Sequence, residues 1–330
     1  MTGEPESPST VGFVGMEMLP YAIGMRTRFR GIDVREGVLI DGPAGWAEFS
    51  PFWDYDDAAS VSWLRAATEA AFEGWPDPVR TEIPVNCTVP GVDPEAAAGI
   101  VRESGCRTAK VKVAERGRPF AEDLDRVEAV RDAIGPDGRV RVDANGGWNV
   151  EEAVSRIHTL ARFDLEYVEQ PCPTAEDLAY VRRRVDVPIA ADESIRTAAD
   201  PMAVRALGAA DIAVLKVQPI GGVRACLRIA EQIGLPVVVS SALETSIGIA
   251  AGVALAAALP ELPYANGLAT VRLLEHDVVS RPLVPVGGVL PVSRPVVDRD
   301  RYAVAAADGP TADRWRTRVS AVQALLAGAR

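Results

Sequence analysis

The sequence predicts an α/β fold in which a modified TIM barrel, (β/α)7β, follows a small N-terminal α+β domain. From about residue 81 onward, short runs rich in Val, Ile and Ala alternate with amphipathic helical segments. That alternation is typical of parallel strands that are buried on both faces. The chain before residue 81 instead reads as strands followed by a helix. No Gly-x-Gly-x-x-Gly motif follows the first βα strand, which disfavours an open dinucleotide-binding sheet.

Changes in composition divide the chain into four segments. The first is polar, rich in Pro and Ser, and lacks the charged-then-apolar pattern of a signal peptide. We expect, in order, a disordered leader, an α+β domain, a barrel that carries the functional site, and a C-terminal segment packed on the first domain or on the barrel exterior. Their expected limits are 1–10, 11–80, 81–290 and 291–330.

The N-terminal domain is predicted from two strands and one helix. Apolar and polar residues alternate over Phe29–Ile40, a turn follows at Asp41-Gly-Pro, and Trp46–Phe49 returns as a partner strand. Helical spacing of apolar residues then predicts a helix over Ala58–Phe72. A second helix is expected over Thr311–Leu326, close to the C-terminus.

Seven apolar runs and one weaker run predict the barrel strands. Amphipathic helices such as Ala121–Ile134 and Val223–Ile233 separate them, and eight units favour a closed barrel over an open sheet. The strands are expected at Ile83–Val89, Ala109–Val113, Val140–Val142, Leu165–Val168, Pro188–Ala191, Ile212–Val217, Pro236–Val239 and, more weakly, Tyr264–Leu268.

Charge and composition exclude several classes of function. The formal net charge of −11 argues against nucleic acid as a partner, because phosphate binding needs a basic face. The longest apolar run, Ile247–Leu259, is too short to span a bilayer and predicts a helix packed against a sheet. Four scattered cysteines indicate neither a zinc site nor a disulfide framework and fit a reducing cytoplasm. We therefore expect a cytoplasmic monomer or small homo-oligomer that acts on a small molecule.

Two lysines share one face of an expected barrel strand. Lys110 and Lys112 alternate with Val111 and Val113, so both ammonium groups point the same way. Burial and mutual repulsion are expected to lower the pKa of at least one of them toward the value that a proton-transfer base needs. Taken alone, the pair favours the other interpretation, an exposed strand face with two solvated lysines.

Acidic residues end the next three expected strands, at Asp143, Glu169 and Asp192. Side chains at these strand ends face the mouth of a barrel, where three carboxylates repel one another unless a cation neutralises them. Oxygen ligands rich in carboxylate favour Mg²⁺. Asn145 and Glu193 follow closely and are expected to support the ligands. The alternative, that each acid caps the next helix, suits one acid better than three in succession.

Lys216 lies in the apolar run of the sixth expected strand, where an unpaired charge is costly. A position facing inward is preferred to one facing the outer helices, because carboxylates and a metal are available there. Lysines from the second and sixth strands then lie on opposite sides of the barrel axis. That arrangement suits proton chemistry on the two faces of a bound carboxylate, with a metal stabilising an enediolate.

With these residues in place, the chain resembles the enolase superfamily, muconate-lactonizing-enzyme subgroup. The resemblance covers almost the whole chain, and it identifies the N-terminal domain as the capping domain of that superfamily. Within the subgroup the chain is similar to the o-succinylbenzoate synthase family of the actinobacterial type. The stretches that carry the similarity are Met25–Gly31, Thr108–Arg116, Tyr167–Cys172, Ala190–Arg196, Val214–Val223 and Ser240–Ser246.

The resemblance implies a Mg²⁺-dependent lyase of menaquinone biosynthesis. The implied reaction is syn-elimination of water from 2-succinyl-6-hydroxy-2,4-cyclohexadiene-1-carboxylate, which gives 2-succinylbenzoate. In this family Lys112 would abstract the α-proton and return it to the departing hydroxyl, and Lys216 would stabilise the anionic intermediate from the other face. Lys110 would orient the substrate carboxylate and depress the pKa of Lys112.

Contacts to the succinyl arm are expected from residues near the strand ends. The candidates are Arg26, Arg28, Ser240, Ser241, Gly221 and Gly222. The arginines fit a solvated strand face equally well, and the serines fit caps of the following helix.

Other reactions on the same scaffold compete with the dehydration. Racemisation of N-succinylamino acids needs both Lys112 and Lys216 as bases, which the sequence permits. Dipeptide epimerases of the subgroup carry an Asp-x-Asp at the eighth strand, whereas Asn266–Thr270 has no acid. Cycloisomerisation of muconate is a third reaction of the subgroup. A non-catalytic barrel protein would not need three acids and three lysines, and the chain keeps all six.

Overall fold

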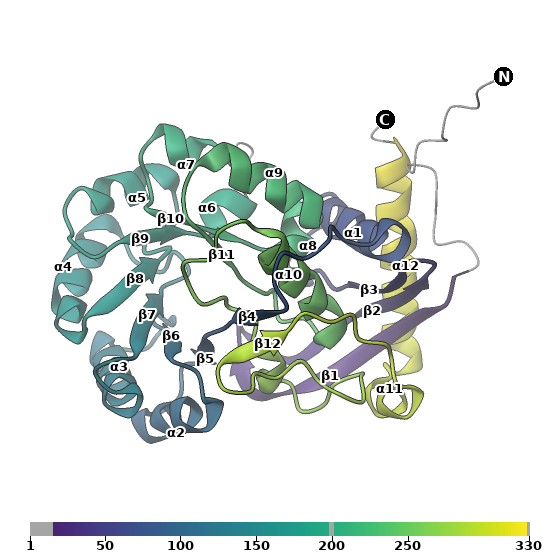
Figure 1. Cartoon of the computed structure of the whole chain (residues 1–330), viewed down its shortest axis with the longest axis horizontal. Helices are drawn as coiled ribbons and strands as arrows, with labels where there is room; N and C mark the ends of the chain where they lie inside the picture. Colours follow the sequence, from purple (N-terminus) through teal and green to yellow (C-terminus); the bar gives the residue numbers. More distant parts are fainter. Residues whose placement is uncertain (1–15, 198–200, 329–330) are drawn as a thin grey trace.

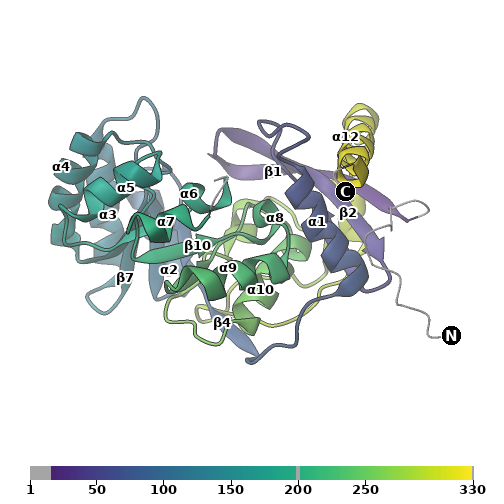
Figure 2. The same ribbon diagram turned by 90° about the horizontal axis from the view of Figure 1, so that it is seen from above.

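The computed structural model describes residues 16–197 and 201–328, so the expected leader at 1–10 lies outside the described residues. A barrel of parallel strands surrounded by helices lies beside a three-stranded antiparallel sheet (Figures 1 and 2). The α/β class and the two-part architecture predicted from the sequence are confirmed. None of the described helices has the length and apolar character needed to cross a membrane.

The capping domain is built on β1 (Met18–Phe29), β2 (Ile32–Gly42) and β3 (Gly45–Phe49), paired in that order. The prediction of one strand over Phe29–Ile40 was wrong at its start, because the chain turns at Arg30 and Gly31. Both residues have positive φ, of 50° and 75°. Arginine rarely adopts that conformation, so the alternating pattern concealed the turn.

Helices complete the capping domain on one face of its sheet. The predicted helix at 58–72 forms as α1 (Val61–Thr68) and a π-helical turn (Glu69–Glu73). The C-terminal helix α12 (Gly309–Gly328) stands beside the same sheet (Figure 1), with Trp315 buried in the capping-domain core. The C-terminal segment therefore packs on the capping domain.

The barrel follows the expected alternation of strand and helix. Its seven-stranded parallel sheet runs in sequence order. The strands are β5 (Cys87–Val89), β6 (Thr108–Lys112), β7 (Arg139–Asp143), β8 (Leu165–Glu169), β9 (Ile189–Ala191), β10 (Ile212–Leu215) and β11 (Val237–Val239). The remaining helices are α2 (Pro94–Ser104), α3 (Phe120–Ile134), α4 (Val150–Leu160), α5 (Ala175–Arg182), α6 (Glu193–Arg196), α7 (Ala203–Ala206), α8 (Val217–Ile220), α9 (Val223–Ile233), α10 (Ser246–Ala258) and α11 (Arg299–Ala305), with 3-10 turns at Ala161–Phe163 and Thr270–Leu273.

Two single-residue bridges close the barrel where the weak eighth strand was expected. Asn266 bridges Val85, and Gly267 bridges Ser240, both in parallel. The first strand expected at 83–89 is divided, since β4 (Glu82–Pro84) pairs instead with β12 (Val289–Pro291) outside the barrel. Pro84 has no N–H for a strand ladder, and the chain changes partners after it.

A buried polar junction joins the capping sheet to the barrel. Arg35 of β2 donates hydrogen bonds to the carbonyl oxygens of Leu243 at 2.9 Å and Ala242 at 3.2 Å, across about 200 residues of sequence. Glu48 of β3 accepts from the Thr245 hydroxyl and from the backbone N–H groups of Thr245 and Gly248. These contacts fix the capping domain over one edge of the barrel mouth.

Replacing Arg35 with methionine is expected to lower the free energy of unfolding by about 3–5 kcal/mol, because buried carbonyl oxygens lose their donor and the buried Glu48 loses a neighbouring positive charge. Urea unfolding measures the loss. Arg28→Met is the matched control: Arg28 pairs with Asp33 on the surface, with 67% of its side chain exposed, and its loss should cost less than about 1 kcal/mol. If Arg35→Met lowers the free energy of unfolding as little as Arg28→Met does, the junction adds no stability.

Beside this junction, Glu244 predicts a dependence of stability on pH. Burial, and then the charge of Glu48, raise the pKa of Glu244 to about 7. The folded state then binds more protons than the unfolded state between pH 4.5 and 7, so stability falls as pH rises through that window.

The expected loss between pH 5 and 8 is up to about 3 kcal/mol. Glu244→Gln should remove the part of the slope that Glu244 contributes, measured by urea unfolding at both pH values, and should leave the part due to Glu169, whose pKa is also raised to about 7. A slope identical to that of the wild type would contradict the assignment.

Candidate active site

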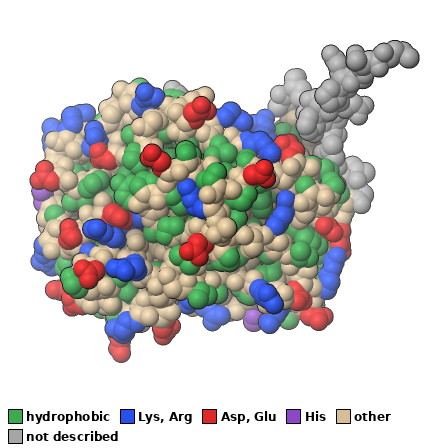
Figure 3. Space-filling model, in the orientation of Figure 1, with side chains coloured by type: hydrophobic (Ala, Val, Ile, Leu, Met, Phe, Trp, Pro, Cys, Tyr) green, Lys and Arg blue, Asp and Glu red, His purple; other side chains and the backbone are tan. Residues whose placement is uncertain are grey.

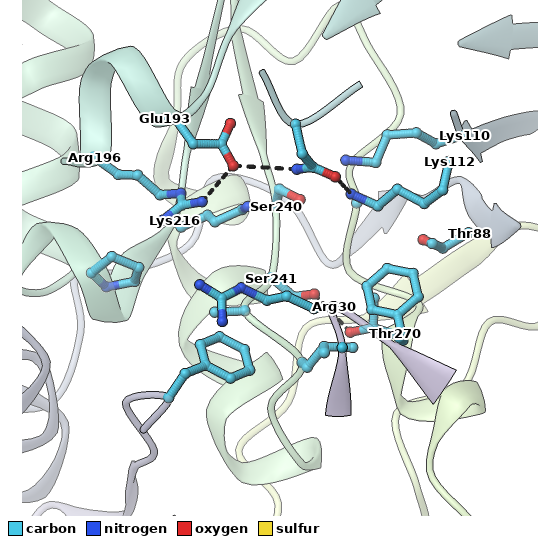
Figure 4. Close-up of a pocket in the computed structure, with 18 of the residues that line it drawn as sticks. Arg30, Thr88, Lys110, Lys112, Glu193, Arg196, Lys216, Ser240, Ser241 and Thr270 are labelled. Carbon is cyan, nitrogen blue, oxygen red and sulfur yellow. Dashed lines mark hydrogen bonds and ion pairs between the residues drawn. The ribbon is translucent and has the colours of Figure 1, made fainter. Parts of the chain in front are cut away.

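A cavity of about 570 Å³ opens at the C-terminal ends of the barrel strands, under the capping domain. Barrel residues and capping-domain residues both line it (Figure 4). Lys110, Lys112 and Lys216 face it from the barrel, and Arg30 and Tyr55 from the capping domain. On the molecular face drawn in Figure 3, acidic and basic side chains are interspersed.

The strand register sets the lysines and acids at matching heights. Lys112 of β6 lies opposite Asp143 of β7, which in turn lies opposite Glu169 of β8. One step below, Lys110 lies opposite Arg141. Because alternate residues of a strand share a face, Lys110 and Lys112 both point to the cavity and line it. Asp143 and Glu169 do not line it but are buried and bond to these two lysines.

Each predicted acid accepts from a predicted lysine. Lys110 Nζ is 2.8 Å from Glu169 Oε1 and 3.1 Å from Asp143 Oδ2. Lys112 Nζ is 2.6 Å from Asp143 Oδ2. On the other side, Lys216 Nζ is 2.6 Å from Asp192 Oδ2. The structure thus brings all six together, with the carboxylates almost completely buried.

The acids do not act as helix caps. Asn149 and Thr174 cap the helices that follow β7 and β8. Asp192 precedes α6, but its side chain makes no capping hydrogen bond. The alternative interpretation of the strand-end acids is therefore excluded.

Burial and neighbouring charges set the pKa values of these groups. Burial would raise the pKa of Asp143, but the ammonium groups of Lys112 and Lys110 outweigh it and lower the pKa. The pKa of Asp192 is lowered in the same way, mainly by Lys216. Burial, and then the charge of Asp143, raise the pKa of Glu169 to about 7.

The expectation of a lowered lysine pKa does not hold for Lys110. Burial favours its neutral form, but the carboxylates of Glu169 and Asp143 outweigh burial and raise its pKa well above the ordinary value. The sequence argument weighed burial and repulsion between lysines without placing two carboxylates within hydrogen-bond reach of Lys110.

Lys216 lies immediately after β10 rather than inside the strand. It occupies the N-cap position of α8 with an extended backbone. From there its side chain enters the cavity opposite the β6 lysines (Figure 4). The preferred inward position is the one observed.

The three acids have the oxygen donors that a hard divalent cation requires. The influence of Asp143 and Asp192 on the pKa of Glu169 indicates that the three charges act on one another. In the described part of the chain, however, no three acidic, His or Cys side chains converge closely enough to hold a metal as placed, because the acids bond to lysines. The donor set fits Mg²⁺ if the acids exchange ammonium partners for the metal.

Asn145 and Glu193 connect to the lysines. Asn145 Oδ1 accepts from Lys112 Nζ at 2.7 Å, and Asn145 Nδ2 donates to Glu193 Oε1 at 3.2 Å. Both residues line the cavity. The backbone N–H of Asn145 also donates to Asp143 Oδ1 at 3.1 Å. Support of the metal ligands by Asn145 and Glu193 stays a prediction.

The residues expected at the succinyl arm separate into two groups. Ser240 and Ser241 line the cavity, and Thr245, not either serine, caps α10. Four others do not line it. Arg26 donates to the carbonyl oxygens of residues 274 and 275, Arg28 pairs with Asp33 on the surface, and Gly221 and Gly222 lie against Ser62 and Glu69 of the capping domain.

Sequence reasoning missed several polar residues that line the cavity, among them Arg30, Tyr55 and Arg196. Arg30 pairs with Asp54 at the turn that the alternating pattern concealed. Arg196 had a detectable signal, because it follows Asp192 by four residues and Glu193 by three, the spacing of neighbours on a helix. Tyr55 lies in a loop, and no sequence pattern marks it.

Comparisons with known proteins agree with this geometry. Residues 21–71 match the family model described as enolase N-terminal domain-like, and residues 93–295 match the model described as enolase C-terminal domain-like. The solved muconate lactonizing enzyme from Pseudomonas fluorescens has the same fold, with a TM-score of 0.77 at 22% identity, over 89% of this chain and 98% of that one.

Two relatives are much closer in sequence. The o-succinylbenzoate synthase of Thermobifida fusca is 64% identical over 92% of this chain and 95% of its own length. That of Mycolicibacterium smegmatis is 53% identical over 92% of this chain and 94% of its own. The chain belongs to the o-succinylbenzoate synthase family of the enolase superfamily.

Proposed function

We propose that this chain is a Mg²⁺-dependent o-succinylbenzoate synthase of menaquinone biosynthesis. Its reaction is the elimination of water from 2-succinyl-6-hydroxy-2,4-cyclohexadiene-1-carboxylate, with 2-succinylbenzoate as the product. The identity of 64% to a synthase over nearly the full chain carries the proposal. The lysines that line the cavity and the buried acids that bond to them are groups of the type that this chemistry needs.

Lys112 is the proposed acid–base group. As a neutral amine it takes the proton from the carbon that bears the ring carboxylate, and the electron pair passes into an enediolate. The resulting ammonium then gives that proton to the departing hydroxyl, so one water leaves and the ring becomes aromatic. Transfer in and out by one group requires that both leaving atoms lie on the same face of the ring, which is a syn-elimination.

The other charged groups stabilise the anion that forms between these two steps. Asp143, Glu169 and Asp192 would hold the Mg²⁺, which, when bound, supplies positive charge to the substrate carboxylate as it becomes an enediolate. Lys216 remains an ammonium on the face opposite Lys112. Lys110 orients the carboxylate end, and Ser240 and Ser241 offer hydroxyl groups to the succinyl arm.

The proposal also covers the cellular compartment, the class of substrate and the oligomeric state. The four cysteines, all within the described residues, are buried and unpaired, which fits the reducing cytoplasm. As elsewhere on this scaffold, the substrate is a small carboxylate. A monomer or a small homo-oligomer is sufficient, because every proposed site residue comes from one chain.

Removing the metal is expected to abolish the reaction. Purified protein is treated with EDTA, and dehydration of the cyclohexadiene substrate is followed by the appearance of the aromatic product. Added Mg²⁺ should restore the rate. Dehydration at full rate in EDTA would contradict the role of the metal, and absence of dehydration with Mg²⁺ would contradict the synthase assignment.

Racemisation of N-succinylamino acids is a second candidate activity. One observation favours it: Lys112 and Lys216 enter the cavity from opposite sides, as a two-base exchange at one carbon would require. Incubation with a single enantiomer in ²H₂O tests it. Loss of optical rotation with incorporation of deuterium supports the activity, and unchanged rotation excludes it.

A further inference from the structure

Arg196 lies at a junction between the barrel and the capping domain. It ends the short helix α6, with 8% of its side chain exposed. Its Nε donates to Asp192 Oδ1 at 2.9 Å and its Nη2 to Glu193 Oε1 at 2.6 Å. Its Nη1 donates to the Tyr55 hydroxyl at 2.5 Å. One guanidinium thus holds two barrel carboxylates and one capping-domain phenol.

From Arg196, hydrogen bonds continue to both lysines of the cavity. Along the first route, Glu193 accepts from Asn145, and Asn145 accepts from Lys112, as the dashed lines of Figure 4 mark. Along the second route, Asp192 accepts from Lys216 at 2.6 Å. The two ammonium groups, on opposite sides of the cavity, are therefore connected through one side chain.

The first route depends on which way the Asn145 amide faces. Its NH₂ group donates to Glu193, so its oxygen is left for Lys112. An amide turned by half a rotation would present NH₂ to an ammonium, which is a donor facing a donor. Arg196 fixes Glu193, Glu193 fixes the amide, and the amide fixes the direction of Lys112.

Tyr55 is held by the interior of the capping domain. Its ring packs against Phe52 and Trp63, with centroids 6.5 Å and 5.8 Å away. Its carbonyl oxygen accepts from Arg318 of α12 at 2.6 Å. The phenol is therefore fixed within the capping domain, and its hydrogen bond to Arg196 makes the position of Arg196 depend on the position of that domain.

We propose that Arg196 is a positioning residue that makes the direction of Lys112 depend on the seating of the capping domain. The planar fork of a guanidinium suits this role, because it holds several partners in fixed directions where a lysine holds a point charge. The proposal rests on the proposed function only for the reaction in which the two lysines act. The hydrogen-bonded connection itself is a property of the chain.

Tyr55→Phe tests the connection at the end remote from the lysines. Loss of one hydroxyl is expected to lower kcat about tenfold, with KM changed by less than about twofold, because the chemistry and not the binding loses its alignment. Arg196→Lys keeps the positive charge but not the fork, and should lower kcat by about 100-fold. Wild-type kcat in Arg196→Lys would overturn the proposal.

A double-mutant cycle separates positioning from a local effect. In an Asn145→Ala background, Tyr55→Phe should lower kcat by less than about threefold, because the first route is already broken. Asp54→Asn is the matched control: Asp54 lies in the same loop and lines the same cavity but pairs with Arg30, outside both routes. The fold-losses in kcat caused by Asp54→Asn and by Asn145→Ala should multiply in the double variant. If the losses caused by Tyr55→Phe and Asn145→Ala multiply as well, Tyr55 does not act through Asn145 and the proposal is overturned.

Hydrogen exchange of the metal-free protein gives a measurement that does not need the reaction. Tyr55→Phe should speed amide exchange in residues 193–197 by about fivefold or more, and Asp54→Asn should not. If the wild type fails to dehydrate the substrate while this difference is seen, the proposed function is wrong and the connection stands. If exchange is unchanged, the capping domain does not act on Arg196 and the proposal fails.

Discussion

Replacing Lys112 with alanine is expected to lower kcat for dehydration by about 10³- to 10⁴-fold, since one group performs both proton transfers. The fold should survive. The Lys112 side chain is 15% exposed, and its partner Asp143 retains Lys110 at 3.1 Å. Steady-state kinetics measure the loss of kcat, and circular dichroism with thermal unfolding measures whether the fold is kept.

Lys112→Arg is the matched control for charge. It keeps a cation beside Asp143, but a guanidinium does not lose its proton in proteins and cannot act as a base. We expect it to be as inactive as the alanine variant and close to the wild type in stability. Activity near that of the wild type in either variant would remove Lys112 from the mechanism.

The second large effect is expected from Glu169→Gln. The substitution keeps shape but removes one of three anionic donors, so kcat/KM should fall by about 10³-fold at low Mg²⁺. Part of this loss should be recovered at high Mg²⁺, because the change weakens metal binding. Lys110 loses its ion pair with Glu169 but keeps the one with Asp143. Rates measured over a range of Mg²⁺ concentrations show whether the variant needs more Mg²⁺ to reach its half-maximal rate.

Glu166→Gln is the control on the same strand. Glu166 lies three residues earlier on β8 and pairs with Arg141 at 2.5 Å, in the deeper part of the barrel. Its substitution is expected to change kcat/KM by less than about twofold. A Mg²⁺ dependence in Glu169→Gln that matches the wild type would mean that Glu169 does not bind the metal.

The positions of the candidate lysines and acids were predictable because they repeat with the architecture. Each follows or ends a buried strand, and the C-terminal ends of parallel strands meet at one mouth. Finding the strands was therefore enough to place Asp143, Glu169 and Asp192 together. Alternation within β6 then placed Lys110 and Lys112 on the cavity side.

The capping domain was harder to predict, because its contribution depends on turns and long-range contacts. Arg26 and Arg28 belong to β1, and the turn at Arg30 carries that residue, not the other two, to the cavity. No local pattern indicates a turn at an arginine with positive φ. The bonds of Arg35 to the loop after β11 span more than 200 residues, a distance over which sequence periodicity carries no information.

Arg318 anchors the loop at residues 51–55, and this contact bears on the order in which parts of the molecule form during synthesis. Arg318 of α12 donates to the carbonyl oxygens of Pro51, Phe52 and Tyr55, and the side chains of Phe52 and Tyr55 line the cavity. This loop precedes its anchor by up to 267 residues of sequence, so it leaves the ribosome well before the anchor does. A nascent chain can hence form its barrel, with the lysines and acids in register, while the capping-domain loop over the cavity still lacks its anchor. The candidate site is therefore complete only after α12 has been made.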